Sequence, residues 1–413
     1  MLDIGQIHRT EYELDNGRSL QGRSRRRHDR HFESQANIPV AAAEAPGRIH
    51  FLGGQGESGF FLSAAIDRYI HVAVSQRKDN SLRFYAADLC ERKRSTLTNV
   101  KYRREDRWAN YLKPAIFLFI EMGYPVKGLN FSFCGNIPQQ VGLASSTAIE
   151  TAAAVALRSL FHVQINDISL AQKLYETHKI FFGISASLAD YLVCLLARKD
   201  QFLVIDDSTG EIIKIKSPFS SFRFLLIDSR VPRMGTESEL TSRRADIIKG
   251  LELLSRKFDG AGFKDFASND LLDVLGDLPE QIRRRSIHIV EEIHRINDAR
   301  DALQRSDLAS LAKIIFHSHE SLRDLYEISC PEIDWLVKRA QEIEGAAGSR
   351  MTGHGFGGCT YTIIRRELVE EYKKRLEEYE RIFGFRPVIY EVKLATGTHV
   401  IHERREAYAN IAY

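Results

Sequence analysis

A loop that leads into a helix constrains the fold of this chain more than any other stretch of its sequence. Residues 135–157 read GNIPQQVGLASSTAIETAAAVAL, so glycines and a proline come first and a run of strong helix formers comes last. This order predicts a loop that ends at a helix N-terminus. Such a terminus presents unpaired backbone N–H groups and the positive end of the helix dipole, and small residues allow an anion to approach both. From this stretch alone, an ordinary helix capped by Ser145 is the alternative.

A second glycine-rich loop, Gly353–Gly358, reads GHGFGG and formally matches the dinucleotide-binding pattern GxGxxG. That pattern requires a strand before the loop and a helix after it. Here a helix is expected before the loop, over 331–345, and a strand after it, over 360–364, which argues against a Rossmann site. A tight glycine turn without a ligand is the plain alternative. The first loop lacks the Gly-Lys-Ser/Thr of a Walker A loop, although backbone amides and serine hydroxyls also hold triphosphates.

The remaining sequence divides into a strand-rich part, a helical part and a short mixed part. Extended apolar runs bounded by turn residues predict strands over 45–54, 60–67, 68–77, 82–88, 222–229, 359–366 and 388–395, and a hairpin over 202–216. Helical patterns predict helices over 108–123, 168–182 and 367–384, after Ser145, and through most of 243–344. The turn at 217–225 is the expected domain boundary.

Composition excludes several classes of protein. The 413 residues are 44% hydrophobic and 27% charged with a net charge of +3, which is typical of a globular protein and offers no broad surface to nucleic acid. The five cysteines are scattered without a CxxC pair, which argues against disulfides and a zinc site and favours a reducing cytoplasm. We expect no membrane span and no secretory signal. The arginine-rich residues 18–31 are interpreted as a solvated arm, with binding of a polyanion or partner as the alternative.

Three segments in a fixed order resemble the signature motifs of one enzyme family. They are APGRIHFLGG at 45–54, GNIPQQVGLASSTAIE at 135–150 and GSRMTGHGFGGC at 348–359. Four further segments look like the same family, at 108–113, 181–190, 228–245 and 319–334. Over residues 32–400 the chain resembles the galactokinase branch of the GHMP kinases.

The resemblance implies the fold and the domain limits. The fold would be α+β, the two-domain GHMP kinase fold, whose N-terminal domain is like domain 2 of ribosomal protein S5. A basic arm would occupy residues 1–36, the N-terminal domain residues 37–220, and the C-terminal GHMP domain residues 221–413. ATP and its acceptor would meet in the cleft between the two domains.

The resemblance also implies how ATP is held. The anion at the helix N-terminus would be the ATP triphosphate, bound by Gly142, Leu143, Ala144, Ser145, Ser146 and Thr147. Ser146 stands where the family has a serine that ligates Mg²⁺. The loop at 353–358 would pack against the phosphate loop, and His354 stands there in place of a smaller residue.

Two further residues would carry the chemistry. Asp190 matches the aspartate that acts on the attacking sugar hydroxyl, as a base or by orienting it, and Arg48 matches an arginine that interacts with that aspartate and the phosphate. Phosphoryl transfer depends mainly on positioning and charge neutralisation, so a carboxylate, a guanidinium and Mg²⁺ suffice in kind. Taken alone, Asp190 reads equally as a first-turn helix carboxylate and Arg48 as a surface ion-pair partner.

The sugar-binding residues depart from the family pattern. The expected sugar contacts are Gln55, Glu57, Gly183 and Asp190. Where the family reads GEHTDY this chain reads GGQGES, so Gly54 replaces a glutamate, Gln55 a histidine and Glu57 an aspartate. Leu240 stands where a sugar-contacting tyrosine is expected. Because buried polar groups must be matched in a carbohydrate site, these changes predict altered or lost recognition of galactose.

The residue expected to bind the metal also departs from the family pattern. The family's second magnesium ligand, a glutamate, aligns with His178, and Glu176 lies two residues earlier. Mg²⁺ prefers oxygen ligands to imidazole. Either the alignment slips, or Ser146, water and the nucleotide hold the metal, or turnover is weak. From the residue alone, His178 reads as an ordinary, partly exposed helical histidine.

The predicted function is an ATP-dependent, Mg²⁺-requiring sugar kinase of the galactokinase family, acting on galactose or, with better support, on a related sugar. The competing hypothesis is a galactokinase-like protein that binds nucleotide, has lost catalysis and serves as a sensor or partner-binding module. Retained Asp190 and Arg48 favour the enzyme, whereas the altered sugar segment and His178 favour the competitor. ATP and a sugar are the expected partners, in the cytoplasm.

Overall fold

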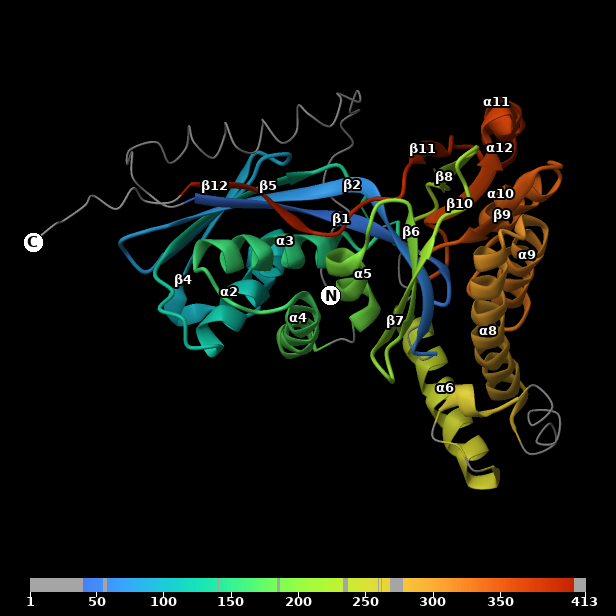
Figure 1. Cartoon of the computed structure of the whole chain (residues 1–413), viewed down its shortest axis with the longest axis horizontal. Helices are drawn as coiled ribbons and strands as arrows, with labels where there is room; N and C mark the ends of the chain where they lie inside the picture. The colour runs from blue at the N-terminus through green and yellow to red at the C-terminus, as the bar shows by residue number, and fades with distance from the viewer. Residues whose placement is uncertain are drawn as a thin grey trace, which may run out of the picture.

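The computed structural model describes residues 40–54, 58–139, 141–183, 186–232, 237–258, 260, 262–267 and 278–404. Within these residues the chain forms an eight-stranded sheet, a four-stranded sheet and helices packed on both (Figure 1). No helix of the described residues is long and apolar enough to cross a membrane.

The larger sheet has the strand order β12-β1-β2-β5-β3-β4, and β6 joins it by pairing with β2 and β7. Its neighbours are antiparallel except β3 and β5, which run parallel. The strands are β1 (Val40–Leu52), β2 (Phe60–Gln76), β3 (Ser81–Ala86), β4 (Glu91–Thr96), β5 (Leu129–Gly135), β6 (Gln201–Asp206), β7 (Glu211–Lys216) and β12 (His399–Arg404).

Helices of the N-terminal half cover one face of this sheet in Figure 1. They are α2 (Lys113–Glu121), α3 (Ser145–Leu160), α4 (Asp167–Phe182) and α5 (Leu188–Leu196). Helix α3 is buried from Thr147 to Leu157 and packs against β1 and β2. Its run of alanines allows the helix to lie close to the sheet, and a helix that is apolar on all sides is typical of a buried one.

The smaller sheet has the order β11-β8-β10-β9. Its strands are β8 (Phe222–Asp228), β9 (Ala346–Met351), β10 (Cys359–Arg365) and β11 (Val388–Val392). The helices of this half are α6 (Glu237–Lys257), α8 (Glu280–Arg305), α9 (Leu308–Asp324), α10 (Pro331–Gln341), α11 (Val369–Leu376) and α12 (Glu378–Phe383). Four short 3-10 helices complete the described structure: η1 (Leu97–Asn99), η2 (Arg104–Tyr111), η3 (Phe263–Asp265) and η4 (Arg366–Leu368).

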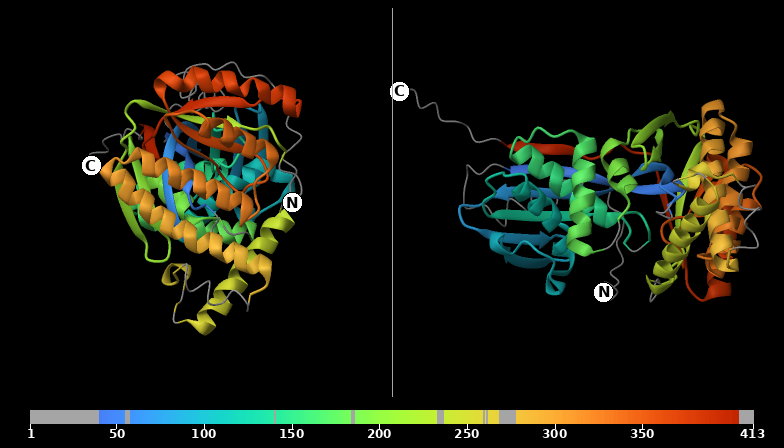
Figure 2. Two further views of the ribbon diagram at one scale, coloured as in Figure 1. Left: turned by 90° about the vertical axis from the view of Figure 1, so that its right-hand side faces the viewer. Right: turned by 90° about the horizontal axis from the view of Figure 1, so that it is seen from below.

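The two halves join where β1 and β2 reach the C-terminal helices, as the right-hand view of Figure 2 shows. The ring of Phe51 packs edge-on against Tyr361 at 4.8 Å between ring centres. The Tyr361 hydroxyl donates a hydrogen bond of 2.6 Å to the Phe51 carbonyl, and both residues are buried. The end of β1 is therefore fixed in the core that the halves share.

Most predicted elements are confirmed, with local corrections. The strands expected over 60–67 and 68–77 are one strand, β2, because the pattern is interrupted only by a bulge opposite Pro46 and Gly47. The helix expected over 108–123 starts as η2 and becomes α2 only at Lys113. Strands β4, β5, β9 and β12 are not among the predicted strands. The helix expected over 367–384 is divided into η4, α11 and α12.

The order in which the chain enters the two sheets can be compared with the expected domain limits. Strand β7 ends in the larger sheet at Lys216 and β8 begins the smaller sheet at Phe222, so the expected boundary lies between two sheets. Strand β12, near the end of the chain, returns to the larger sheet and pairs with β1. Pairing of this kind covers an edge that would otherwise expose unpaired backbone groups. The division at residue 220 therefore does not describe the path of residues 399–404.

Candidate active site

Three segments that are distant in the sequence meet beside β1. The backbone N–H of Arg48 donates to the Leu143 carbonyl over 3.2 Å. A Cβ atom on Gly47 would lie 3.2 Å from that carbonyl oxygen, so glycine permits the close approach. Gly142, at φ +86°, touches the second glycine-rich loop, since a Cβ on it would stand 2.8 Å from the Gly353 Cα atom. The prediction that the two glycine-rich loops pack together is confirmed.

Helix α3 begins at Ser145 with Ala144 as its N-cap residue, in the left-handed conformation at φ +58°. No side chain caps this terminus, so the alternative in which Ser145 is the cap is wrong. The first N–H groups of a 16-residue helix are therefore left for an anion. Ser145 and Ser146 are partly exposed at this terminus, whereas Thr147 is buried.

The second glycine-rich loop joins β9 to the antiparallel strand β10. The expectation of a helix directly before this loop is wrong, because residues 346–351 form β9 between α10 and the loop. The sequence AAGSRM has little strand preference of its own, and pairing with β10 holds it extended. A strand still follows the loop, so the Rossmann arrangement does not occur here. His354 is exposed on the loop.

Arg48 and Asp190 form a buried ion pair across 142 positions of sequence. The Arg48 Nε atom donates to Asp190 Oδ1 over 2.6 Å, and Nη1 donates to the Gly142 carbonyl over 2.7 Å. Arg48 is 4% exposed, so the reading of Arg48 as a surface ion-pair partner is wrong. Asp190 lies in the first turn of α5, where the helix dipole favours a negative charge. The guanidinium therefore connects the loop before α3 to the carboxylate.

His50 is a site residue that the sequence motifs do not reveal. Its Nε2 atom lies 2.8 Å from Asp190 Oδ1, and its Nδ1 atom lies 2.6 Å from the Ser63 hydroxyl. His50 and Ser63 face each other across the β1–β2 pair. One signal was present in the sequence, because His50 lies two residues after Arg48 and side chains two apart on a strand share a face.

The charges of this cluster shift the pKa values of its members. Burial alone would raise the pKa of Asp190, but the Arg48 charge and the hydrogen bond with His50 outweigh it and hold the pKa well below its usual range. Burial and the Arg48 charge lower the pKa of His50 to about 4. At neutral pH the site therefore contains a carboxylate, a guanidinium and a neutral imidazole.

Asp207, just after β6, adds a second carboxyl group near Asp190. Burial and the negative charge of Asp190 raise the pKa of Asp207 to about 7. Its Oδ1 atom is buried and has no hydrogen-bond partner among the described residues. Its backbone N–H donates to the Gly59 carbonyl over 2.8 Å, which joins the end of β6 to the start of β2.

Two protein-family domains match the sequence of this chain. The GHMP kinases N terminal domain matches residues 110–198, and the GHMP kinases C terminal domain matches residues 299–381. A Treponema pallidum protein named "Putative galactokinase" is 38% identical over 381 residues, which are 90% of this chain and 95% of that protein. The chain belongs to the galactokinase family of the GHMP kinases. The enzyme class that follows is carbohydrate kinase, a phosphotransferase with an alcohol group as acceptor.

Two further relatives of the galactokinase family support the assignment. The galactokinase of Bacillus subtilis is 30% identical over 361 residues, which are 86% of this chain and 92% of that enzyme. The crystal structure of Lactococcus lactis galactokinase complexed with galactose superposes with a TM-score of 0.82 at 25% identity, over 87% of this chain and 95% of that one. The predicted two-domain GHMP kinase fold is confirmed.

In this galactokinase-family chain, a buried pair of charges from the C-terminal half holds the backbone of Gly53. This residue begins the segment that is expected to bind the sugar, residues 53–58 (called the sugar segment below). The Gly53 N–H donates to Glu292 Oε1 over 2.9 Å, and Arg350 Nη2 donates to the Gly53 carbonyl over 2.9 Å. Arg350 and Glu292 are each 1% exposed and lie 3.1 Å apart. The Ser318 hydroxyl donates a hydrogen bond to Glu292 and accepts one from Arg350 Nε. The backbone N–H and C=O of Gly53 are thus both held by side chains from the other half of the molecule.

The sugar segment itself is only partly described. Gln55 and Glu57, two predicted sugar contacts, lie outside the described residues. Gly54 is described, at φ +94°, and a Cβ on it would lie 3.4 Å from His50. Gly183, another predicted contact, is exposed and ends α4 in the left-handed conformation. Leu240 is half-buried in the first turn of α6.

The predicted metal position consists of a hydroxyl and a histidine that is already engaged. His178 is 5% exposed, so the reading of it as partly exposed is wrong. Its Nδ1 atom lies 2.9 Å from Glu150 Oε1, and the Tyr191 hydroxyl donates to Glu150 Oε2 over 2.7 Å. Glu176 is exposed on α4. No group of three histidine, cysteine, aspartate or glutamate side chains in the described part of the chain is arranged to hold a metal.

The protein offers few free oxygen ligands here, so these residues suit a Mg²⁺ ion that is bound mainly by the nucleotide and water. Glu150 is fully buried, and both of its oxygens already accept hydrogen bonds from His178 and Tyr191. The Ser146 hydroxyl, which is partly exposed like that of Ser145, is an oxygen donor at the start of α3. Mg²⁺ keeps several waters and is commonly bound by substrate phosphates with one or two protein ligands, so this sparse set is compatible with it.

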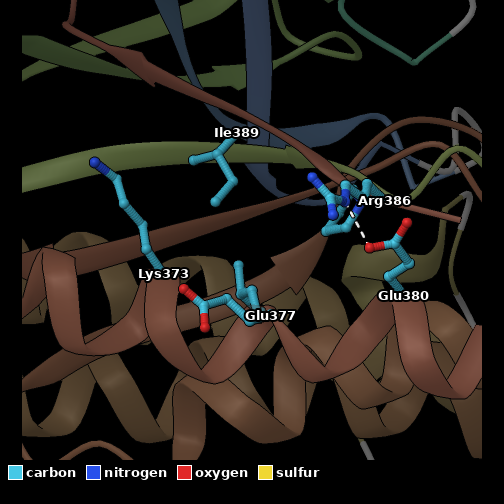
Figure 3. A pocket seen from close by; sticks show the side chains of 7 residues that line it. Lys373, Glu377, Glu380, Arg386 and Ile389 are labelled. Carbon is cyan, nitrogen blue, oxygen red and sulfur yellow. Dashed lines mark hydrogen bonds and ion pairs between the residues drawn. The ribbon is translucent and has the colours of Figure 1, made fainter.

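A hollow of about 400 Å³ lies elsewhere, between α11, α12 and β11 (Figure 3). Lys373, Glu377, Glu380, Arg386 and Ile389 line it together with Leu376 and Pro387. Arg386 is bonded across its rim to Glu380 over 2.5 Å. The predicted site residues contribute nothing to this hollow, so it is separate from the Arg48–Asp190 site.

Proposed function

We propose that this protein transfers the γ-phosphoryl group of ATP to a hydroxyl of a sugar other than galactose. The observation that carries the proposal is the buried Arg48–Asp190 pair, which is bonded to the phosphate loop through Gly142. This pair brings a carboxylate and a guanidinium to one end of the loop before α3. A proton acceptor and a positive charge beside an anion site are the groups that phosphoryl transfer requires.

In this proposal the backbone N–H groups at the start of α3 bind the triphosphate. Arg48 neutralises charge on the transferring group, since its Nη2 atom has no hydrogen bond to a described residue. Asp190 accepts the proton of the attacking hydroxyl or orients that hydroxyl. When bound, Mg²⁺ would neutralise charge on the phosphates, and Ser146 would hold it together with nucleotide oxygens and water.

The acceptor is proposed from the sugar segment. Gly54 has no side chain where the family has a glutamate, and Gln55 and Glu57 change the remaining polar contacts. A sugar site discriminates by matching buried polar groups, so a different set of groups favours a different sugar. Domain limits at 37–220 and 221–413 belong to the same proposal, except that residues 399–404 pair in the sheet of the first domain. A cytoplasmic location is also proposed, and the scattered cysteines support it.

The test is a screen for phosphoryl transfer by the purified protein. ATP, Mg²⁺ and single sugars would be incubated with the protein, and ADP release above the ATPase background would be measured for hexoses, amino sugars, deoxy sugars, uronic acids and pentoses. We expect one class to exceed galactose in kcat/KM. Selective turnover of galactose at about 10⁴ M⁻¹s⁻¹ or more would show that the substitutions do not change the acceptor. Binding of ATP without any turnover would favour the nucleotide-binding sensor instead.

A further inference from the structure

We propose that His50 is a positioning residue for the phosphoryl transfer, held in one tautomer by Ser63 so that it fixes one oxygen of Asp190 and leaves the other oxygen for the acceptor hydroxyl. The inference rests on the proposed function and adds two residues to it. It is carried by a chain of hydrogen bonds that starts in β2, crosses to β1 and ends on α5.

The tautomer of His50 follows from its two neighbours. An ionised carboxylate only accepts hydrogen bonds, so the Nε2 atom, 2.8 Å from Asp190 Oδ1, must carry the proton. Because a neutral imidazole has one N–H, Nδ1 is then an acceptor. The Ser63 hydroxyl, 2.6 Å away and fully buried, donates to it. Burial and the Arg48 charge, which lower the pKa of His50, agree with the neutral ring.

Both hydrogen bonds to Asp190 fall on the same oxygen. Arg48 Nε and His50 Nε2 donate to Oδ1 from 2.6 and 2.8 Å. The other oxygen, Oδ2, has no hydrogen-bond partner among the described residues, and it is not among their fully buried unpartnered atoms. Two donors on one oxygen fix the rotation of the carboxylate about its Cβ–Cγ bond. They therefore present Oδ2 in one direction, which is what a group acting on a hydroxyl requires.

His50 also touches the start of the sugar segment. A Cβ atom on Gly54 would lie 3.4 Å from the Cβ and Cδ2 atoms of His50. The other side of the ring packs on Phe61, with 4.9 Å between ring centres. The imidazole therefore lies between Asp190 and the backbone of the segment that is proposed to bind the acceptor. A residue in this place sets the position of the carboxylate relative to the sugar.

The experiment compares two substitutions of His50 that differ in one hydrogen-bond donor. His50→Gln places an amide N–H near the position of Nε2, whereas His50→Leu removes the donor at similar volume. With the best acceptor of the screen, we expect His50→Leu to lower kcat by about 10- to 100-fold, the range of a hydrogen bond to a charged group. KM for ATP should change by less than about twofold, since the imidazole does not touch the phosphate loop. His50→Gln should recover kcat to within about threefold of wild type.

His71→Leu is the matched control. Like His50, His71 is buried and lies close to a carboxylate, that of Glu44 at 3.3 Å, but it belongs to β2. It should leave kcat unchanged, which separates positioning of Asp190 from general damage to the sheet. Thermal midpoints of all variants report whether each one folds. A kcat for His50→Leu within about threefold of wild type, or equal loss in His50→Gln and His50→Leu, would overturn the proposal.

The tautomer is a second readout that does not depend on turnover. In protein labelled with ¹⁵N-histidine, long-range ¹H–¹⁵N NMR spectra at pH 7 should show His50 protonated on Nε2 only, and Ser63→Ala should shift its Nδ1 resonance. Protonation on Nδ1, or on both nitrogens, would overturn the proposal even if His50→Leu fails to fold. If the wild-type protein phosphorylates no acceptor, the proposed function fails, and the tautomer still decides the assignment of the hydrogen bonds.

Discussion

The Arg48 guanidinium donates through Nε to Asp190 Oδ1 over 2.6 Å and through Nη1 to the Gly142 carbonyl over 2.7 Å. One planar group thus fixes the distance between the proposed proton acceptor and the proposed phosphate loop. The fixed fork of an arginine can hold both partners at once, which the single charged atom of a lysine does less well. Preorganised charges of this kind favour phosphoryl transfer because they do not need to rearrange during the reaction.

Replacement of Gly142 should abolish the effect of ATP on stability. A Cβ at Gly142 would stand 2.8 Å from Gly353, whereas a Cβ at Gly210, which also has positive φ, meets nothing within 4 Å. We therefore expect Gly142→Ala to remove the rise of the thermal midpoint with ATP and Mg²⁺, which a ligand of the folded state produces by mass action. Gly210→Ala should keep that rise. It introduces the same backbone strain as Gly142→Ala but no close contact with another loop. An equal rise in Gly142→Ala and wild type would place the nucleotide elsewhere.

Breaking the buried pair that holds Gly53 should be costly. Arg350→Met removes one of the two guanidinium partners of the buried Glu292 carboxylate and leaves Arg295, whose Nε lies 2.9 Å from Oε2, as the other. Removal of one member of a buried pair costs about 3 to 5 kcal/mol when no partner remains, so we expect a loss that approaches this range. Arg375→Met is the control, since the Arg375–Glu371 pair is exposed and contributes about 0 to 1 kcal/mol. Urea unfolding measures both losses. A loss in Arg350→Met as small as that in Arg375→Met would contradict the proposed role of the pair.

Stability should fall in mild acid because two buried histidines are neutral in the folded protein. Burial lowers the pKa of His288 to about 3, and burial with the Arg48 charge lowers that of His50 to about 4, from an ordinary 6.5. Below pH 6.5 the unfolded chain binds more protons than the folded one, so the free energy of unfolding decreases as the pH falls. The decrease is about 1.4 kcal/mol per pH unit for each histidine down to its folded pKa.

Urea unfolding between pH 7.5 and 4.5 measures this dependence. His288→Gln should make it shallower by the contribution of one histidine. The raised pKa of Asp207 contributes in the opposite direction over this range, so the same curve is also measured for Asp207→Asn. A level curve between pH 6.5 and 5 in Asp207→Asn would show that these imidazoles are not neutral and buried.

Asp207→Asn should stabilise the protein at alkaline pH. Burial and Asp190 raise the pKa of Asp207 to about 7 from an ordinary 3.8, so the folded protein disfavours its ionised form. This cost grows as the pH rises from 3.8 to 7 and is complete above pH 7, whereas asparagine is neutral throughout. We expect the thermal midpoint of Asp207→Asn to exceed that of wild type at pH 8 and to match it near pH 4. The same difference at both pH values would show that ionisation of Asp207 has no part in it.

The fold and the pairing of Arg48 with Asp190 could be predicted because short motifs mark them. The loop at 135–157 predicts a helix N-terminus from composition alone, and the motif order identifies the partners Arg48 and Asp190. Strand β9 escaped prediction because AAGSRM is extended only through its pairing with β10. The same limit applies to His50 and Ser63, whose contact depends on the register between β1 and β2. Asp207 is similar, since its pKa depends on burial and on a charge from another element.

The most direct test of the central claim is the turnover of Asp190→Asn with the best acceptor of the screen, measured beside its affinity for ATP. Asparagine keeps the size of the side chain and removes the charge that accepts a proton, a change that typically costs about 10² to 10⁴ in rate. We predict a fall in kcat within that range with the Kd for ATP nearly unchanged, because the carboxylate acts on the acceptor hydroxyl. A kcat equal to that of the wild-type protein would contradict the assignment of the Arg48–Asp190 pair as the catalytic centre.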